Sequence, residues 1–405
     1  MDQRGGDASP ADKALARDLA LGVVRRLNTL DWALSPLTSR PFASLDPAVR
    51  AALRLGAFQL LFAMDRFPAY AALNETVPLA GPKAKGLVNA VLRALQRQGL
   101  PPWPDDPATS LSLKHSHPEW LVRRWLARWG TEAEKVLEAG NAEPPFSLRV
   151  NRRRATPEAL AASLRGEGHE AVSSPISPDG VRVKKFFSLS ENASFGEGLF
   201  SVQDEAAQLA VAALDPRPGE TVLDACAGVG GKTAHAAERL DGRGRVVAVD
   251  TDGERLSLSR RNVRRLGLDG VETVEADVRR GGWPESDRVL VDAPCSGLGT
   301  VRRRPDIKWA VGEEDVAHRL PALQGEILRA AAQAVKPGGV LVYATCTTEP
   351  EENEGVVGAF LAERGDFAAE APPLPAALAS PDFFVRLRPD LHGTDGFFIA
   401  LLRRK

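Results

Sequence analysis

Cysteine is scarce in this sequence, which has only Cys226, Cys295 and Cys346. The three form neither a CxxC pair nor a cluster with histidine. An odd and sparse set of this kind excludes a disulfide framework and indicates no zinc site. Taken alone, a single cysteine is most often a small buried hydrophobic residue.

Long hydrophobic runs are also absent. No stretch reaches the roughly 18 apolar residues of a membrane-spanning helix, and the polar segment Met1 to Ala11 lacks the apolar core of a signal peptide. The hydrophobic content of 43% and charged content of 26% are typical of an ordinary globular protein. We therefore expect a cytoplasmic monomer with no membrane partner and no metal.

The sequence has no excess of positive charge, since its net charge is −1. That is not the basic balance of many nucleic-acid-binding proteins. Its basic residues do gather in clusters, and any one cluster is more often a solvated face than a phosphate site. The clusters are Arg123–Arg124–Arg128, Arg149–Arg152–Arg153–Arg154, Arg182–Lys184–Lys185, Arg302–Arg303–Arg304 and Arg403–Arg404–Lys405. Their spread along the chain is compatible with RNA binding but does not establish it.

The first part of the chain has a helical pattern. Apolar residues such as Leu15, Leu19 and Val23 repeat at spacings of three and four, and prolines interrupt the run. This predicts an all-α bundle of short helices over residues 1–140. Its last helical piece, His117–Gly140, has tryptophans at helical spacing, which we expect in the core rather than stacked on bases.

Residues 141–201 have a mixed pattern. The segment FSLRVN predicts a strand, TPEALAASLRGEG a capped helix, and VRVKKFFSL a second strand. A small α+β domain is the simplest interpretation. We expect it to contact RNA together with the N-terminal bundle.

Residues 202–405 alternate strands with helices. Strands are predicted at 221–225, 245–250, 271–277, 288–293 and 339–345, with helices at 233–240, 254–266 and 319–335. Strands that are apolar on both faces and separated by helices indicate a parallel sheet covered on both sides. We therefore predict a Rossmann-like α/β domain. The last two strands, FFVRLRP and GFFIALLRR, are predicted to form an antiparallel edge pair.

A glycine-rich turn, DACAGVGGKT, follows the first of these strands. Cys226 stands where a Walker A loop needs glycine, and Gly228-Val229-Gly230 supplies only the beginning of a dinucleotide motif. The second strand ends in Asp250, where a carboxylate can accept ribose hydroxyls, and the third ends in Asp277, placed to accept from an adenine amino group. This set fits S-adenosylmethionine better than NAD.

The fourth and fifth strands each end at a cysteine. Asp292-Ala293-Pro294-Cys295 follows one and Thr345-Cys346 follows the other. Methyltransferases that act on exocyclic amines usually carry Asn/Asp-Pro-Pro-aromatic at the first position. A Pro-Cys instead suggests attack on a ring carbon, because addition of a thiolate to carbon 6 of cytosine makes carbon 5 a good nucleophile. A nearby cation such as Lys232 would favour the thiolate.

These segments resemble a known family. The motifs DACAGVGGKT, DAPCSGLGTVRRRPDIKW, YATCTTEPEENE and VQDEAAQ are similar to those of the RNA 5-methylcytosine methyltransferases, the Nol1/Nop2/Sun family. The segments LNTLDWAL, LRLGAFQLLF, ALNETV and KGLVNAVLRAL look like the NusB-type RNA-binding domain. This fusion is the architecture of bacterial enzymes that methylate cytosine in 16S ribosomal RNA. The resemblance covers almost the whole chain.

The resemblance implies roles for individual residues. Cys346 would be the nucleophile, Cys295 would assist product release, and Asp292 would also hydrogen-bond the cytosine. The implied S-adenosylmethionine site consists of Cys226, Ala227, Gly228, Val229, Gly230, Gly231, Lys232, Asp250, Asp277 and Asp292. One departure is that Gly228-Val229 stands where the family usually has Ala-Pro.

Two other functions remain open from the sequence. A transfer RNA cytosine methyltransferase would share the same catalytic motifs. A NusB-like transcription or assembly factor with a vestigial enzyme half would bind RNA without modifying it. The implied partner is 16S ribosomal RNA, and the sequence does not identify the target nucleotide.

Overall fold

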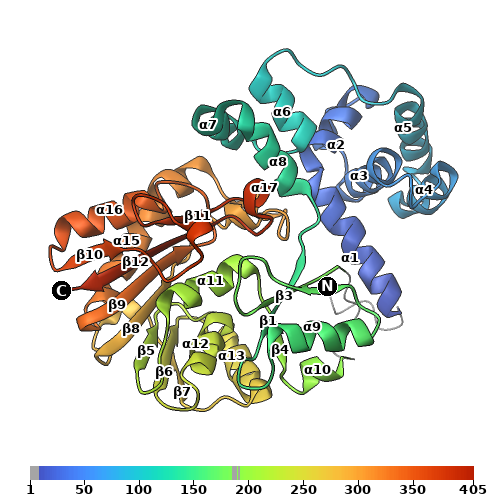
Figure 1. Cartoon of the computed structure of the whole chain (residues 1–405). Helices are drawn as coiled ribbons and strands as arrows, with labels where there is room; N and C mark the ends of the chain where they lie inside the picture. The colour runs from blue at the N-terminus through green and yellow to red at the C-terminus, as the bar shows by residue number, and fades with distance from the viewer. Residues whose placement is uncertain (1–8, 185–188, 190–191) are drawn as a thin grey trace. The chain divides into compact units, whose positions relative to one another are not determined.

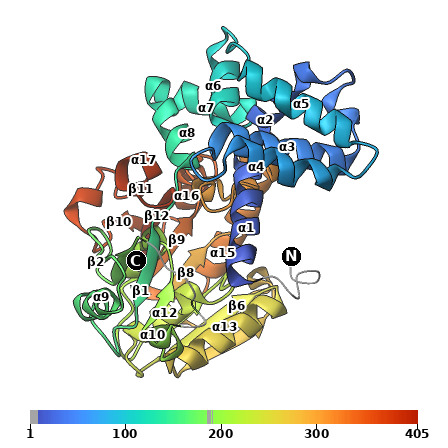
Figure 2. The same ribbon diagram turned by 90° about the vertical axis from the view of Figure 1, so that its right-hand side faces the viewer.

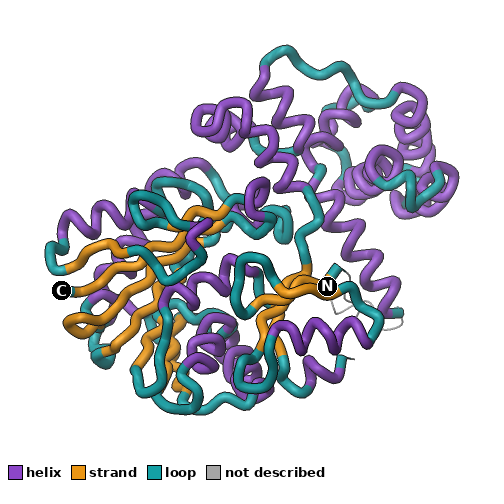
Figure 3. Tube along the Cα trace, viewed as in Figure 1, coloured by secondary structure: helices purple, strands orange, loops and turns teal. Residues whose placement is uncertain are grey.

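The computed structural model describes residues 9–184, 189 and 192–405. The chain forms two compact units. The first runs to Ala142 and includes the segment Arg304–Ala310, whereas Glu143–Arg303 and Val311–Lys405 make up the second. Among its described residues the first unit has only helices, and the second combines helices with strands (Figures 1 and 3). No helix in the described ranges has the length and apolar character needed to cross a membrane.

The first unit is an all-α bundle, as the apolar periodicity predicts. Its helices are α1 (Pro10–Arg25), α2 (Leu27–Leu34), α3 (Pro47–Phe62), α4 (Ala69–Thr76), α5 (Lys85–Gln98), α6 (Pro107–His115), α7 (Glu119–Trp129) and α8 (Ala133–Asn141). A reciprocal capping box between Ser9 and Asp12 starts α1. Leu30, Leu53 and Leu92, from three different helices, are fully buried in the shared core.

The helical piece expected over residues 117–140 is two helices, because Gly130 takes a positive φ between α7 and α8. Trp125 is only 2% exposed, which confirms its predicted core position.

A short segment from late in the sequence also belongs to this first unit. It contains α14 (Ile307–Ala310), whereas the sequence analysis places residues 304–310 in the C-terminal α/β domain. The buried Lys308 amine donates to the carbonyl of Arg25, and the Trp309 indole donates to the carbonyl of Val24. These carbonyls end α1, where they have no partner within the helix and hydrogen-bond donors are favourable.

The second unit begins with a small antiparallel sheet. Its strands are β1 (Phe146–Val150), β2 (Ala171–Ser173), β3 (Gly180–Val183) and β4 (Phe200–Val202), in the order β2-β3-β1-β4. Helix α9 (Pro157–Gly166), capped by Thr156, packs on this sheet, and α10 (Ala193–Gly196) precedes β4. The predicted α+β character is confirmed. Residues 185–188 of the second predicted strand, with Lys185 of its basic cluster, lie outside the described residues.

The main sheet contains all five predicted parallel strands. These are β5 (Thr221–Asp224), β6 (Arg245–Asp250), β7 (Val271–Glu275), β8 (Ser286–Asp292) and β9 (Val335–Thr345). The full order is β10-β12-β9-β8-β5-β6-β7, with β11 paired to β12. This arrangement confirms the predicted α/β fold.

The prediction of an edge pair at the C-terminus was wrong for one strand. β11 (Val385–Leu387) does pair antiparallel with β12 (Phe397–Arg404), but β12 also pairs with β9 and with β10 (Phe367–Glu370). β12 is therefore an interior strand. Its residues from Phe397 to Leu402 are all buried, which suits a strand covered on both faces.

Helices cover both faces of the main sheet (Figures 1 and 2). On one face α11 (Glu205–Leu214), α12 (Gly231–Arg239) and α13 (Gly253–Leu266) pack, and on the other α15 (Leu320–Ala332) and α16 (Glu354–Glu363). The strand order reverses between β5 and β8. In open α/β sheets, ligands bind outside the carboxyl ends of the strands at such a point.

Candidate active site

The glycine-rich loop connects β5 to α12 at the carboxyl edge of the sheet. Gly228 and Gly230 have φ values of +53° and +81°, which are readily adopted only by glycine. A Cβ on Gly230 would lie 2.9 Å from the Cα of Ser259 and closer still to its side chain. The Gly228 amide donates to Asp250 at 2.7 Å, so the loop is fixed to the end of β6.

Asp250 and Asp277 stand at the ends of β6 and β7, as predicted. Asp250 accepts a second backbone amide, from Asp252, at 2.9 Å. Asp277 forms a bidentate ion pair with Arg279, and this hydrogen bonding lowers the pKa of the Asp277 carboxyl. Both carboxylates are partly exposed, so each can accept further donors.

Asp224, at the end of β5, is a buried carboxylate with one unused oxygen. Its Oδ2 accepts from the Thr233 hydroxyl at 2.6 Å, whereas Oδ1 has no hydrogen-bond partner in the described part of the chain. Burial raises the pKa of this carboxyl to about 6. Unpaired buried oxygens are rare, so this one marks the region beneath the glycine loop as incompletely hydrogen-bonded.

Lys232 lies in the first turn of α12 and pairs with Asp292, which ends β8. Their Nζ and Oδ2 atoms are 2.6 Å apart, and the Lys232 side chain is 12% exposed. Burial would lower the pKa of Lys232, but attraction to Asp292 outweighs it, so the pKa is raised. Lys232 therefore stays charged in the site, and Cys346 is among the groups that stabilise its charge.

The cysteines at the ends of β8 and β9 meet in space. The Sγ atoms of Cys295 and Cys346 are 3.2 Å apart, and both residues are partly buried. Interaction with Cys346 and burial hold the pKa of the Cys295 thiol well above its ordinary value. The third thiol, Cys226, is at the end of β5, and burial raises its pKa strongly too. The structure thus brings together every residue that the sequence analysis assigned to the site.

A buried polar network lies behind the Pro-Cys loop, and the sequence analysis did not assign it a role. Glu352 is fully buried and accepts from the Ser296 amide at 2.8 Å and from the Gln324 side chain at 2.9 Å. The Ser296 hydroxyl lies 2.5 Å from Glu352 and 3.0 Å from the Thr347 hydroxyl. Ser296 and Thr347 directly follow the two cysteines, so this network joins both loops.

Two further contacts fix the loop that carries Cys346. Asn353 hydrogen-bonds the Thr345 hydroxyl and donates to the Thr347 carbonyl. The Gly299 amide donates to the Cys346 carbonyl at 3.0 Å, and only glycine fits there because a Cβ would strike Gly396. Sequence alone offers no signal that separates Glu352 from its acidic neighbours, since burial distinguishes them and burial depends on the fold.

The basic clusters are largely occupied inside the second unit. Arg302 and Arg303 both pair with Asp395 at 2.7 Å. Arg182 pairs with the buried Glu205. These arginines stabilise buried carboxylates, so they are not available as a free basic surface.

Arg149, from another of the basic clusters, is also unavailable as a basic surface, because its side chain is fully buried. From β1 it donates to Glu238 on α12 and to the carbonyl of Gly231, at 2.6 Å each. The small antiparallel sheet is thereby fixed to the start of the helix that follows the glycine loop. A residue of an apparent basic cluster therefore supports the glycine loop from inside the fold.

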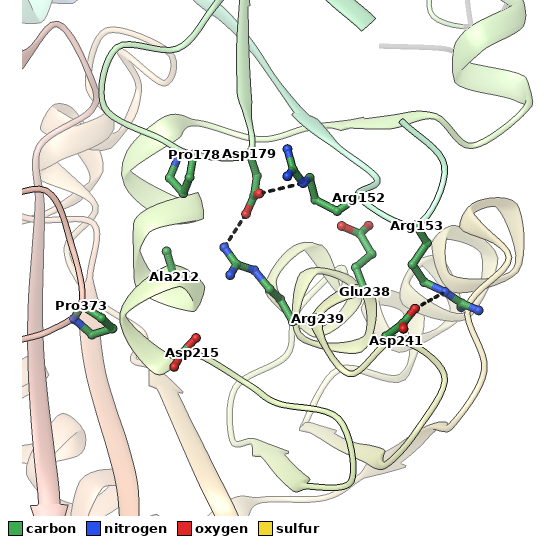
Figure 4. Close-up of a pocket in the computed structure, with 10 residues that line it drawn as sticks. All are labelled: Arg152, Arg153, Pro178, Asp179, Ala212, Asp215, Glu238, Arg239, Asp241 and Pro373. Carbon is green, nitrogen blue, oxygen red and sulfur yellow. Dashed lines mark hydrogen bonds and ion pairs between the residues drawn. The ribbon is translucent and has the colours of Figure 1, made fainter. Parts of the chain in front are cut away.

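A cavity of about 510 Å³ lies away from these residues, at the C-terminal end of α12 (Figure 4). Its charged lining is paired internally, since Asp179 contacts Arg152 and Arg239, and Arg153 contacts Asp241. None of the predicted site residues lines it. The candidate site is therefore the strand-end cluster and not this cavity. Over the described ranges, no group of three or more His, Cys, Asp or Glu side chains is arranged to hold a metal ion.

Families of known proteins match three consecutive parts of the chain. The NusB family matches residues 2–97, and a ferredoxin-like domain of RsmF/B-like methyltransferases matches residues 117–190. The family described as 16S rRNA methyltransferase RsmB/F matches residues 211–403.

Similar proteins extend over nearly the full chain. The ribosomal RNA small subunit methyltransferase B of Klebsiella pneumoniae subsp. pneumoniae is 39% identical, over 98% of this chain and 91% of that protein. The protein of the same name from Pseudomonas syringae pv. tomato is 41% identical, over 96% of this chain and 89% of its own length.

Two solved structures are also similar. The crystal structure of PH0851 has a TM-score of 0.86 and 30% identity, covering 99% of this chain and 92% of that chain. The crystal structure of NSun6 from Pyrococcus horikoshii with SFG has a TM-score of 0.64 and 25% identity, covering 71% and 98%. The chain belongs to the ribosomal RNA small subunit methyltransferase B family, the RsmB/F methyltransferases.

Proposed function

We propose that this protein transfers a methyl group from S-adenosylmethionine to carbon 5 of a cytosine in 16S ribosomal RNA, with Cys346 as the nucleophile. The observation that carries the proposal is the 3.2 Å contact between Cys295 and Cys346, beside the Lys232–Asp292 pair. Carbon 5 of cytosine is a poor nucleophile until a group adds to carbon 6, and a thiolate does this well. A pair of thiols suits that chemistry, because one can add while the other handles a proton.

The cofactor half of the site fits S-adenosylmethionine, which supplies an electrophilic methyl group when bound. The glycine loop, beneath which the unpaired oxygen of Asp224 lies, would receive its amino-acid part. Asp250 would accept the ribose hydroxyls, and Asp277 would accept the adenine amino group while sharing its charge with Arg279. Loss of any of these acceptors would leave a buried ligand donor unpaired.

The residues of the thiol half divide the reaction between them. The Cys346 thiolate forms a bond from sulfur to carbon 6, and the electron pair of the 5,6 double bond becomes available at carbon 5. After carbon 5 has gained the methyl group, the Cys346 sulfur would leave carbon 6 and take a proton from the Cys295 thiol, 3.2 Å away. The resulting Cys295 thiolate would take the proton of carbon 5, which restores the ring. Asp292 would hold the cytosine by a hydrogen bond during both steps.

The electrostatics support Cys346 over Cys295 as nucleophile. Lys232 is charged, and Cys346 lies close enough to be among the groups that stabilise this charge. Contact with Cys346, burial, Glu352 and Asp292 all raise the pKa of Cys295. Cys295 therefore serves best as a neutral thiol that assists release of the product.

Ribosomal RNA as substrate is supported by the relatives, which are named ribosomal RNA small subunit methyltransferase B and match along almost the full chain. The NusB-family bundle and the ferredoxin-like sheet would supply RNA contacts, and the strand-end cluster the chemistry.

A methylation assay with two RNA classes tests the proposal. Full-length protein and S-adenosylmethionine are incubated with unmodified 16S ribosomal RNA or with unmodified transfer RNAs, and 5-methylcytosine is mapped by bisulfite sequencing. We expect one protected cytosine in the ribosomal RNA and none in the transfer RNAs. Methylation of transfer RNA alone would favour the other enzyme class, and binding of both ligands without any methylation would indicate an RNA-binding factor.

A further inference from the structure

Glu352 lies behind the loops that carry the two cysteines, and it takes no direct part in the proposed reaction. It is fully buried, so substrate and solvent do not reach it. Its donors are all neutral, namely the amide and hydroxyl of Ser296 and the side-chain amide of Gln324. A buried carboxylate that is held by neutral donors costs stability compared with an apolar side chain. Such a group is retained where its position or charge serves the site.

The contacts of Glu352 converge on the two cysteine loops. Ser296 follows Cys295 directly, and its hydroxyl bridges Glu352 to Thr347, which follows Cys346. Gln324 also donates to the carbonyl of Pro294, the residue before Cys295, at 3.0 Å. The Glu352 backbone takes part as well, since its carbonyl accepts from the Tyr343 hydroxyl at 2.6 Å. One carboxylate therefore sets the spacing between the loops that carry the two thiols.

The charged and titratable groups around Cys295 are few. They are Cys346, Glu352, Asp292 and Tyr343. Among the residues that the structure describes, the cation in contact with this set is Lys232, which pairs with Asp292. Negative charge thus lies on the Cys295 side and positive charge near Cys346. Three hydrogen-bond donors favour the ionised form of Glu352, while burial raises its pKa.

We propose that Glu352 is a positioning residue that locks the Cys295 and Cys346 loops together through Ser296 and keeps Cys295 as a neutral thiol beside the nucleophile. This inference rests on the proposed function for its meaning in catalysis. Without the carboxylate, the two sulfur atoms would separate, and Cys295 would ionise more easily. The enzyme would then lose the spacing of the two sulfur atoms and the proton that Cys295 gives to the Cys346 sulfur when the sulfur–carbon bond breaks.

The test compares Glu352→Gln with Glu354→Gln in the full-length protein. Glu354 is a matched control, because it lies two residues away and pairs with Arg386 rather than with either cysteine loop. In Glu352→Gln we expect kcat to fall by about tenfold or more, while KM for RNA and the Kd for S-adenosylmethionine change by less than about twofold. Glu354→Gln should match the wild type.

A second readout separates positioning from mere structural support. Iodoacetamide alkylation is followed over a range of pH by mass spectrometry, since Cys295 and Cys346 fall in different tryptic peptides. In Glu352→Gln the midpoint for Cys295 should move to lower pH by about one unit. Identical profiles in Glu352→Gln and Glu354→Gln would overturn the proposal, and so would a lower kcat with an unchanged Cys295 profile.

A milder variant keeps the test decisive if Glu352→Gln does not fold. Ser296→Ala removes the bridging hydroxyl but keeps the backbone amide that donates to Glu352. We expect the same changes in kcat and in the Cys295 profile, at smaller size, and wild-type values for both would again overturn the proposal.

The alkylation readout needs no turnover. If the wild type does not methylate cytosine in either RNA, the proposed function fails, while the effect of Glu352 on Cys295 is still measured.

Discussion

The cofactor half of the active site and its thiol half are built differently. Around the glycine loop the support comes from backbone, such as the Gly228 amide on Asp250, and one oxygen of Asp224 has no partner in the described residues. Around the cysteines the support comes from buried side chains, above all Glu352 and Ser296. The first half leaves an oxygen of Asp224 open, whereas in the second the Glu352 carboxylate has its hydrogen bonds already made and only the Gln324 Oε1 atom lacks a partner among the described residues.

This difference follows from what each half must do. A cofactor that enters and leaves has to complete the hydrogen bonds of its own site, so unpaired acceptors are retained there. A covalent step requires its reacting thiols in fixed positions, because misplacement of reacting groups costs a large part of the rate. Substitutions on the thiol side should therefore change rates, and those on the cofactor side should change affinity.

The largest effect is expected from the cysteines themselves. Cys346→Ala removes the nucleophile, so we expect no methylation and no covalent RNA adduct. Cys295→Ala keeps the nucleophile but slows release, so a protein–RNA band that survives denaturation should accumulate on a gel. Cys226→Ala is the matched control, because this cysteine does not contact the other two, and no adduct band is expected. An adduct with Cys346→Ala but not with Cys295→Ala would reverse the roles.

Gly230→Ala should break the cofactor half. The positive φ of +81° and the 2.9 Å approach to the Ser259 backbone leave no room for a Cβ. We expect a strain of about 1–3 kcal/mol and loss of measurable S-adenosylmethionine binding by calorimetry. Gly358→Ala, exposed in α16 with no atom near its Cβ position, should instead stabilise the protein by up to about 1 kcal/mol. Normal cofactor affinity in Gly230→Ala would show that the loop is not the binding element.

Asp224→Asn should separate stability from affinity. Burial raises the pKa of Asp224 from 3.8 to about 6. Below pH ~4 the carboxyl is protonated in both the folded and the unfolded chain, and between pH ~4 and ~6 only the unfolded chain ionises. This group therefore lowers the free energy of unfolding as pH rises through that window, by up to about 3 kcal/mol.

The variant removes this titration. Urea unfolding at pH 7.5 should show Asp224→Asn to be more stable than the wild type, with little difference at pH 4. Calorimetry should show weaker S-adenosylmethionine binding, since the open acceptor is replaced. A variant that is less stable at pH 7.5 would contradict the assignment of Asp224 as a strained, ligand-directed carboxylate.

Much of this architecture follows from the sequence, for a physical reason. Parallel strands are recognised by continuous apolar runs, and the residue that ends each run must appear at one sheet edge. That logic places Asp250, Cys295 and Cys346 at the same edge of the sheet before any coordinates are known. The interior position of β12 was not predicted, because an apolar pattern predicts that a segment is a strand but not which strands lie beside it.

The partners of buried polar groups were beyond sequence analysis. Arg149 belongs to an apparent basic patch, but its partner Glu238 is 89 residues away along the chain. Glu352 lies among several acidic residues that pattern does not distinguish. Which residues form a hydrogen-bond network depends on how close the fold brings them together, and the sequence gives only their types. The buried residues that hold the catalytic loops in place are therefore found only from the structure.

The smallest expected effect concerns RNA affinity of the first unit. Lys85, Arg93 and Arg97 form an exposed stripe at spacings of four and eight on α5, opposite its buried face. If they contact phosphate, replacing each with glutamine should weaken RNA binding several-fold and reduce the slope of log affinity against log salt by roughly one unit.

Lys135→Gln is the control, because Lys135 already pairs with Glu132 in the same unit. These substitutions should leave kcat at saturating RNA unchanged, since the stripe belongs to neither half of the active site. An unchanged salt slope in all three variants would place the RNA contacts of this unit on another face.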